Sequence, residues 1–520
     1  MKKKFLGLAV GLLSLALLTA CGNSNADQAV SDESSNDTFT MAISGSPTAT
    51  NPIVAGDRFG LTVVNMIYSP LARLDTNNEM ELVLAQSFNV SDDGLVITVD
   101  LRDDVLWSDG ERFTASDVVF TYEIMADRDN GNYLDMWVGE EVIEVSANGD
   151  YQVVFTLPSV SAAAIGNLLL INYILPEHVF ADEPDFSASV LEANPVGTGP
   201  YVLVNQVHGE YLQFEANEHY FGGEVNIPTI TLRIIENADT QRAALQSGQI
   251  DAAVIFPADI PDFNEDEINV FPFSENRVGY LGLNVATEEL SDARVRQAIR
   301  YALNIEDMNI AAYLSNDFFN TPVTFLPPNN PFATTDVNTF DQNLERAREL
   351  LDEAGVENLQ LNIGFGSNDP AQTIQATLIQ EQLSQIGITV NLEGGDASAM
   401  FAHLREPGNT QFNMWLGGYI MGNDPDAYRA LFHSAGGSNF WNYSSDEADR
   451  LFDEAAVELD EASRKELYVE LQQVINEDSI IVPIVDNLRI LAVNNRIGGV
   501  ESAGLVPIYT FQDMSKLYIR

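Results

Sequence analysis

The sequence predicts an α/β protein with more than one domain, and three observations support this prediction. Two strand–helix–strand units lie far apart in the chain, and strands of alternating polarity are concentrated in its first third. The chain has 520 residues, whereas single hydrophobic cores rarely grow beyond roughly 250–300 residues. We therefore expect two or three domains.

The alternating strands come first along the chain. The segment "GLVITVDL" (94–101) follows a turn at 91–93, and "YQVVFTL" (151–157) follows a turn at 148–150. Alternation of apolar and polar residues between turn signals is typical of half-buried strands. This region is expected to form mixed or antiparallel sheet.

The strand–helix–strand units follow. In the first, strands at 229–235 and 250–256 flank a helix at 238–248 that ends at Gly248. In the second, strands at 359–365 and 388–393 flank a helix from about Pro370 to Ile386. These units predict two separate α/β sheets.

Two amphipathic helices are predicted at 291–303 and 343–355. The first aligns apolar residues on one face, and the second does the same before Gly355 ends it. The aligned residues are Val295, Ala298, Ile299, Ala302, Leu344, Ala347, Leu350, Leu351 and Ala354. We expect both stripes to pack into the protein core.

The N-terminus has the layout of an export signal. Three lysines precede an apolar run from Phe5 to Leu18 and then small residues, which is typical of a secretory signal peptide over 1–20. The run is shorter than the ~20 apolar residues of a membrane-spanning helix. The polar stretch that follows, 21–37, is expected to be a disordered tether.

Cys21 is the single cysteine of the chain. A lone thiol has no partner for an internal disulfide. The segment Leu18-Thr19-Ala20-Cys21-Gly22 resembles the lipobox of bacterial lipoproteins, which implies lipidation of Cys21 with fatty acyl chains such as palmitate. The alternative is an ordinary signal peptide with an incidental cysteine.

The chain is strongly acidic, with a formal net charge of −52 at pH 7. Nucleic acids and anionic lipids attract basic surfaces, so neither is expected as a partner. Beyond the export signal the only lysines are Lys465 and Lys516. Because arginine stays protonated at high pH, this composition suggests a halophilic or alkaliphilic host; a merely acidic surface is the alternative.

Motifs for catalysis and metal binding are missing from the sequence. A phosphate-binding P-loop needs a lysine that the chain lacks between Lys4 and Lys465. Ser46 has no nucleophile elbow, and the loops 75–82 and 127–135 do not match a calcium-binding EF-hand. The histidines are scattered; they are His178, His208, His219, His403 and His433. No enzymatic activity, metal or cofactor is expected.

Four segments carry a resemblance to a known family. The segment 95–123 holds "LRDDVLWSDGERFTASDVVF", in which Ser108-Asp109-Gly110 forms a tight turn and Thr114–Asp117 forms a helix start. The others are "NPVGTGPYVL" (194–203), "ANEHYFGG" (216–223) and "LNVATEELSDARVRQAIRYALN" (283–304). Together they resemble the solute-binding proteins of peptide ABC importers, the family of oligopeptide-, dipeptide- and nickel-binding proteins, from about Thr38 to Arg520.

The resemblance implies a two-lobed fold of the periplasmic-binding-protein type (class II) with an extra subdomain in lobe I. The implied segments are 38–56, 193–281 and 489–520 for lobe I, 57–192 for the inserted subdomain and 282–488 for lobe II. It also implies a function. Such a protein captures oligopeptides by hinge closure outside the cytoplasm and delivers them to a membrane permease with its ATPase subunits. A monomer anchored to the cell membrane through Cys21 is expected.

The resemblance also implies where the ligand binds. The matching segments are 44–52 and 413–428, where backbone groups would pair with an extended peptide. The implied contacts are Ser46, Pro47, Thr48, Trp415, Leu416 and Gly417. Trp415 and Tyr419 are candidates for side-chain pockets, with core packing as the alternative.

One position departs from the family pattern. Many relatives place an Asp that pairs with the peptide ammonium where this chain has Gly418. Asp424 or Asp426 could replace it, and Asn439 and Tyr443 in 433–449 are further polar candidates. A different ligand, such as an oligosaccharide or a metal chelate, is the alternative. A surface hydrolase, or a peptide-sensing or chaperone-like lipoprotein, is another.

Overall fold

The computed structural model describes residues 37–76, 78–128, 130, 136–170, 172–182, 186, 195–406 and 408–520. The predicted export signal, Cys21 and nearly all of the predicted tether lie outside these residues. So does most of the loop 127–135.

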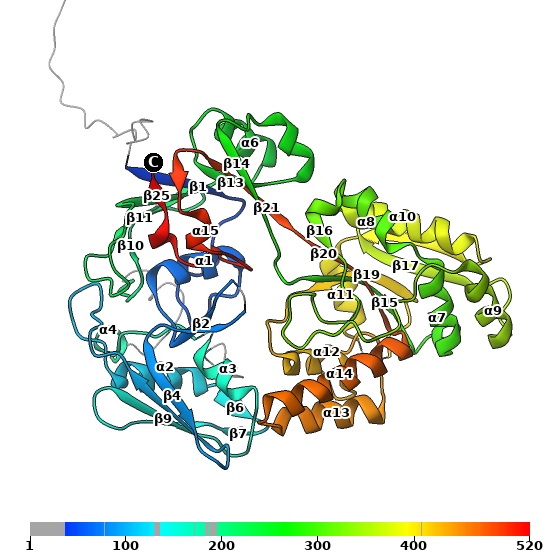
Figure 1. Ribbon diagram of the computed structural model, residues 1–520, viewed down its shortest axis with the longest axis horizontal. Helices are drawn as coiled ribbons and strands as arrows, with labels where there is room; N and C mark the ends of the chain where they lie inside the picture. The colour runs from blue at the N-terminus through cyan, green and yellow to red at the C-terminus, as the bar shows by residue number, and fades with distance from the viewer. Residues whose placement is uncertain are drawn as a thin grey trace, which may run out of the picture. The chain divides into compact units, whose positions relative to one another are not determined.

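A seven-stranded sheet forms the first lobe, which we call lobe I (Figure 1). Its strands come from the start, the middle and the end of the chain. In sheet order they are β10 (Tyr201–Val207), β11 (Tyr211–Ala216), β12 (Thr229–Ile234), β1 (Thr38–Ile43), β13 (Ala252–Ile255), β21 (Arg489–Asn494) and β14 (Ile268–Phe273).

The first predicted strand–helix–strand unit is present in lobe I as β12, α6 (Ala238–Gln246) and β13. Its two strands are not neighbours, because β1 lies between them and pairs in parallel with both. Asn237 caps α6 by accepting a hydrogen bond from the Thr240 backbone N–H at 2.9 Å. A strand from the chain's beginning thus completes a unit formed two hundred residues later.

A four-stranded antiparallel sheet occupies the first third of the chain, as predicted. It consists of β4 (Ala85–Val90), β5 (Val96–Leu101), β9 (Gln152–Thr156) and β8 (Glu144–Ala147). Helix α2 (Ala115–Ala126) packs on it and begins at Thr114, whose backbone N–H donates to Asp117 at 2.8 Å. Apolar residues of this sheet and of α2, such as Phe155, share one buried core with lobe I, and this core includes residues from Phe39 to Leu517.

A six-stranded sheet forms the second lobe, lobe II, which includes the second predicted unit as adjacent parallel strands. In sheet order its strands are β16 (Phe319–Asn320), β20 (Ile481–Asn487), β15 (Val278–Leu283), β19 (Met414–Tyr419), β17 (Gln360–Gly366) and β18 (Thr389–Gly395). Helix α10 (Pro370–Ser384) connects β17 to β18.

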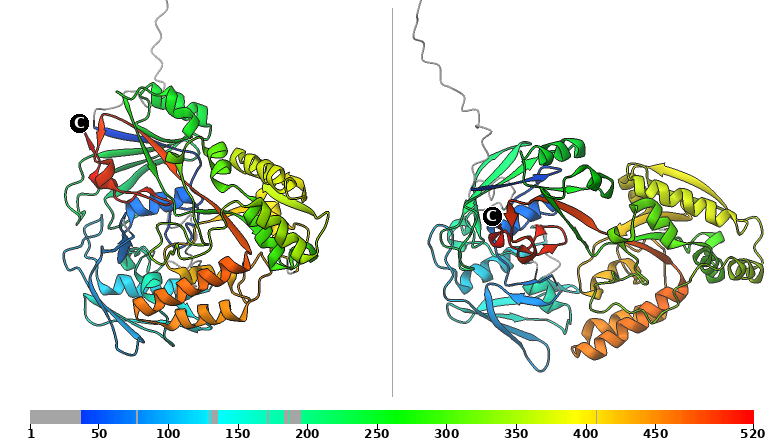
Figure 2. Two further views of the ribbon diagram at one scale, coloured as in Figure 1. Left: turned by 45° about the vertical axis from the view of Figure 1, so that its right-hand side comes forward. Right: turned by 45° about the horizontal axis from the view of Figure 1, so that its top comes forward.

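Helices cover both faces of this sheet (Figures 1 and 2). One face packs against α7 (Ala293–Ala302), α8 (Ile305–Tyr313), α9 (Leu344–Ala354) and α10. The other packs against α11 (Ala397–Leu404), α12 (Arg429–Phe432), α13 (Asp446–Val457) and α14 (Glu461–Asp478). The predicted stripe on α7 is buried, and α9 ends at Gly355 with a φ of 71°.

Shorter helices and strand pairs complete lobe I and the segment 57–192, the expected inserted subdomain. They are α1 (Arg58–Ile67), α3 (Ala164–Leu169), α4 (Glu177–Phe180) and α15 (Val500–Ala503), with the strand pairs β2 (Ala72–Leu74) and β3 (Met80–Leu82), β6 (Trp137–Val138) and β7 (Glu141–Val142), β22 (Ile497–Gly498) and β25 (Tyr518–Ile519), and β23 (Leu505–Val506) and β24 (Thr510–Phe511). The turn at Gly110 has a φ of 91°, which glycine adopts without strain.

The chain crosses between the lobes twice. The first crossing, 274–277, joins β14 to β15, and the second is Leu488, between β20 and β21. The first crossing precedes the boundary expected at 281, because Val278 already pairs with Tyr419 in the lobe II sheet. No helix in the described part of the chain is long and apolar enough to cross a membrane.

Candidate functional site

An open strand edge lies at the centre of the candidate site. Strand β15 pairs with β19 along its whole length, from Met414 to Tyr419. On the opposite side of β19, the pairs with β17 end at Gly364 and Trp415. Beyond that point, Leu416–Gly418 have no strand partner on this side within the described residues. An unpaired edge of this kind can add an extended peptide as a further strand.

Trp415 lies in the core, not in a pocket. Its side chain is 0% exposed, and its ring centroid lies 5.5 Å from that of Trp441. A Cβ atom on Gly282, its partner across the strands, would come within 2.3 Å of the indole ring. Of the two roles that the sequence left open for Trp415, the structure shows core packing.

Leu416 and Tyr419 are buried as well. Leu416 is 2% exposed and packs on the opposite face of the sheet from Trp415. Tyr419 is 9% exposed, and its hydroxyl donates a hydrogen bond to the Phe325 carbonyl at 2.6 Å. Burial, followed by the neighbouring Tyr428 and Tyr280, raises the pKa of Tyr419 well above its usual value. Both side chains are engaged within lobe II, so the backbone of β19 is the part of this strand to consider for a ligand.

Gly418 is the exposed residue of β19. The space that a side chain would fill here is taken by a guanidinium group: a Cβ on Gly418 would lie 2.1 Å from Nη2 of Arg277. Sequence reasoning identified Gly418 but missed Arg277. The register of β15 against β19 brings Arg277 to this place, and no motif in the sequence signals that register.

Asp424 is already paired. It forms a two-point ion pair with Arg464, with Nη1–Oδ2 and Nη2–Oδ1 distances of 2.9 and 2.8 Å. It also caps the short helix that begins at Pro425. Because both oxygens serve the fold, Asp424 is a poor substitute for the missing ammonium acceptor.

Asp426 differs from Asp424. Its Oδ1 is buried without a hydrogen-bond partner among the described residues. Burial raises the pKa of Asp426, and the charge of Asp424 adds to this effect. A buried carboxyl with spare acceptor capacity remains a candidate partner for a ligand cation.

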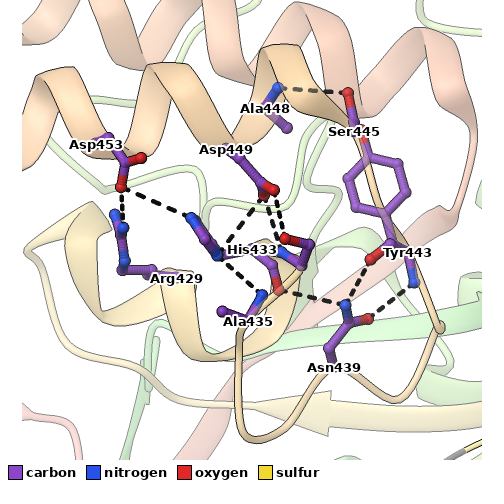
Figure 3. Close-up of polar contacts among 10 residues, drawn as sticks. Arg429, His433, Ala435, Asn439, Tyr443, Ser445, Ala448, Asp449 and Asp453 are labelled. Atoms are coloured by element: carbon purple, nitrogen blue, oxygen red, sulfur yellow. Dashed lines mark hydrogen bonds and ion pairs between the residues drawn. The ribbon is translucent and has the colours of Figure 1, made fainter.

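Asn439 and Tyr443 hold a loop together, as Figure 3 shows. The Asn439 Nδ2 donates to the Tyr443 carbonyl at 2.7 Å, and its Oδ1 accepts from the Tyr443 N–H at 3.0 Å. The Tyr443 hydroxyl donates to Asp478 at 2.5 Å. These bonds engage the polar atoms of both side chains within the protein, and a role of Asn439 and Tyr443 as ligand contacts stays a prediction.

His433 lies beside the same loop, between two carboxylates (Figure 3). Its ring nitrogens lie 3.7 Å from Asp449 and 3.7 Å from Asp453, and Arg429 also pairs with Asp453. The Ala435 N–H donates to Nδ1 of His433 at 3.0 Å. Within the described ranges, no group of three or more His, Cys, Asp or Glu side chains is placed to hold a metal.

The lobe I segment Ser46–Thr48 follows β1. Ser46 and Pro47 are half-buried, whereas the Thr48 N–H donates to Asp57 Oδ2 at 2.9 Å and is not free for a ligand. Burial acts to raise the pKa of Asp57, but hydrogen bonds from Thr48, Gly60 and Phe59 outweigh it and lower the pKa. Asp57 thereby fixes the segment to the start of α1.

The first crossing is joined to the end of β20 beside the site. The Ser274 hydroxyl on the first crossing lies 2.8 Å from Asp486, which is buried at the end of β20. Burial raises the pKa of Asp486 despite hydrogen bonds from Asn320, Ser274 and the Arg277 N–H. Polar contacts therefore fix the first crossing to the end of β20, just before the second crossing.

Two surface hollows of about 300 and 390 Å³ lie elsewhere in lobe II. One is lined by residues around Asn338 and Asn476, and the other by residues around Glu288 and Asn413. The first includes no residue of the candidate site, and the second reaches the candidate segment 413–428 at Asn413, before β19 begins.

Comparison with known proteins shows which family model and which named relatives the sequence matches. Residues 79–442 match the model of bacterial extracellular solute-binding proteins, family 5, middle region. The chain is 28% identical over 513 residues to the oligopeptide-binding protein AppA of Bacillus subtilis, covering 92% of each chain. It is 25% identical to heme-binding protein A of Haemophilus influenzae, covering 96% of each.

Solved structures show the same fold. The ABC transporter substrate-binding protein CtaP of Listeria monocytogenes matches with a TM-score of 0.89 and 33% identity, covering 93% of this chain and 99% of that one. AppA of Bacillus subtilis in complex with a nonapeptide matches with a TM-score of 0.73 and 25% identity, covering 93% and 99%. The two-lobed fold expected from the sequence is thereby confirmed.

Proposed function

The chain belongs to the bacterial extracellular solute-binding proteins of family 5, and from this premise we propose that it binds extended peptides for an ABC importer. It acts without chemistry of its own. A peptide enters between the lobes, and a permease with its ATPase subunits receives it. The relatives named for oligopeptide binding and for ABC transport support this proposal.

The observation that carries the proposal is the open edge of β19. Leu416, Gly417 and Gly418 offer backbone groups that β17 does not pair. Side chains on either face are buried or absent there, so recognition through the backbone tolerates many peptide sequences. Ser46 and Pro47 of lobe I, with Tyr419 and Asp426 of lobe II, remain proposed as neighbours of the bound chain.

The two crossings act as the hinge in this proposal. Lobe II then runs from 278 to 488, and the lobe I segments and the inserted subdomain keep their other expected bounds. Domain closure commonly pivots on a few residues at the ends of elements. The ligand favours the closed form because it contacts both lobes.

A lipid at Cys21 anchors the protein to the outer face of the cell membrane in this proposal. The lipobox-like segment and the polar stretch after it support this placement. Two or more acyl chains hold a soluble domain at a membrane stably, whereas one chain binds only marginally. The folded part is expected to act as a monomer.

A second candidate function keeps the fold and changes the ligand. Gly418 provides no carboxylate for a peptide ammonium, and one relative is named for heme binding. An oligosaccharide or another solute would then occupy the site. A sensing or chaperone-like role would begin with the same binding event.

The test combines mass spectrometry with hydrogen exchange. The fragment from Gly22 to Arg520 is purified, mildly denatured and searched for released ligands. A ladder of peptides is expected, and returning a synthetic member should slow amide exchange at 414–419 but not in α9. Released sugars, or peptides that leave 414–419 unprotected, would refute the peptide edge.

A further inference from the structure

Arg277 lies across two glycines that face each other. Gly279 of β15 and Gly418 of β19 are direct partners in the ladder. A Cβ on Gly279 would lie 2.9 Å from Nη1 of Arg277, and one on Gly418 would lie 2.1 Å from Nη2. The glycine pair therefore leaves room for the guanidinium to rest on the surface of the sheet.

The guanidinium has few partners within the protein. Its Nη1 donates to Asn487 Oδ1 at 3.1 Å. In the described part of the chain, no carboxylate oxygen lies within 4.0 Å of it as an ion pair. The neighbouring Asp486 accepts the backbone N–H of Arg277 and already receives side-chain hydrogen bonds from Ser274 and Asn320. Arg277 thus keeps donors that are free for another group.

The position of these donors matters because Gly418 is exposed and ends the open edge of β19. A ligand strand added along Leu416–Gly418 would reach the guanidinium. The planar fork of arginine binds a carboxylate through two parallel N–H···O bonds. Asp486 is the nearby charge that interacts with Arg277, but a half-buried cation that has no ion-pair partner within 4.0 Å among the described residues still gains from such a carboxylate.

We propose that Arg277 is a specificity-determining residue that binds a carboxylate of the ligand over the Gly279–Gly418 pair. This inference rests on the proposed peptide function. Position 418 has no acidic side chain, and the guanidinium of Arg277 lies over it instead. The site is therefore expected to bind a ligand carboxylate where the relatives bind an ammonium group. The carboxylate is either the peptide C-terminus or an Asp or Glu side chain.

Calorimetric titration with four matched synthetic peptide pools tests the inference. The pools have free ends, an acetylated N-terminus, an amidated C-terminus, or both caps, and each is made with and without Asp and Glu. Wild-type affinity should fall about 10- to 100-fold when the carboxylate is removed. Amidation reveals a terminal carboxylate, and omission of Asp and Glu reveals a side-chain carboxylate.

Variants then assign the effect to Arg277. Arg277→Gln should bind every pool with the affinity that the wild type shows for pools without the carboxylate. Arg277→Lys should recover part of the preference for pools that carry the carboxylate. Arg348→Gln removes one charge from an exposed site on α9 in the same lobe and should behave as wild type. The double variant Arg277→Ala/Gly418→Asp should instead lose affinity for acetylated pools.

The outcomes separate two failures. Equal binding of every pool by the wild type overturns the inference and leaves peptide binding intact. If Arg277→Gln weakens the binding of every pool by the same factor, the preference for a carboxylate does not depend on Arg277. Its role is then to hold Asn487, and the inference is also overturned. Binding of no pool by any variant or the wild type overturns the proposed function, and the inference with it.

Discussion

Glu275 on the first crossing and Arg489 just after the second form an ion pair, with Oε1 and Nη1 3.2 Å apart. The same oxygen lies 2.5 Å from Nη1 of Arg58 at the start of α1. The Glu275 side chain is 8% exposed. One carboxylate therefore joins the first crossing to the start of β21 and to the start of α1, and it balances two arginines that would otherwise repel each other.

Glu275→Gln should destabilise the protein by about 3 kcal/mol or more, because removal of one partner leaves buried charge uncompensated. Burial already lowers the pKa of Arg489, and the charge of Arg58 acts in the same direction. Urea unfolding gives the change in free energy. Glu81→Gln, which breaks the more exposed Arg73–Glu81 pair, should cost about 1 kcal/mol or less. Equal losses would contradict a special role for Glu275.

The local elements of the fold could be predicted from the sequence. Periodicity identified α7, α9 and the two strand–helix–strand units because these patterns depend on residues close in the chain. The order of the lobe I sheet could not be predicted this way. The insertion of β1 between β12 and β13 depends on pairing across two hundred residues, which leaves no local signal.

The sequence predicted the segment that holds the candidate site, but it did not predict the role of each residue there. The resemblance pointed to 413–428, and β19 with its open edge lies there. Aromatic residues such as Trp415 and Tyr443 are common in ligand sites, but packing against residues far away in the chain buries both side chains. Arg277 was missed because only the tertiary register brings it to Gly418.

Trp415→Ala should lower the free energy of unfolding by about 3–5 kcal/mol, since it empties a fully buried site beside Trp441. Thermal and urea unfolding measure this loss. Trp137→Ala, at a half-buried position on β6, should cost less. At temperatures where the variant is folded, peptide affinity should stay close to wild type. Normal stability with lost peptide binding would instead place Trp415 in a pocket.

Cys21→Ser should release the protein from the membrane, because the hydroxyl of serine cannot carry the thioether-linked lipid. Fractionation of cells followed by immunodetection should find wild type with membranes and the variant in the soluble or secreted fraction. Mass spectrometry of the wild-type N-terminal peptide should show the added mass of acyl chains. An unmodified Cys21, or membrane retention of the serine variant, would contradict lipid anchoring.

Asp486→Asn should remove the loss of folding stability with rising pH that the buried carboxyl causes at the hinge. Burial raises the pKa of Asp486 above its ordinary value of 3.8, so the folded protein binds this proton more tightly than the unfolded chain. The stabilisation due to the protonated carboxyl is present at low pH and is lost as pH rises through the raised pKa. In urea unfolding from about pH 3.5 to 7, the stability of the variant relative to wild type should therefore increase with pH and then level off. Asp92→Asn, in an exposed turn, changes the charge equally and serves as the control. If the Asp486→Asn difference were constant over this range, or fell with rising pH, the buried carboxyl would not be responsible.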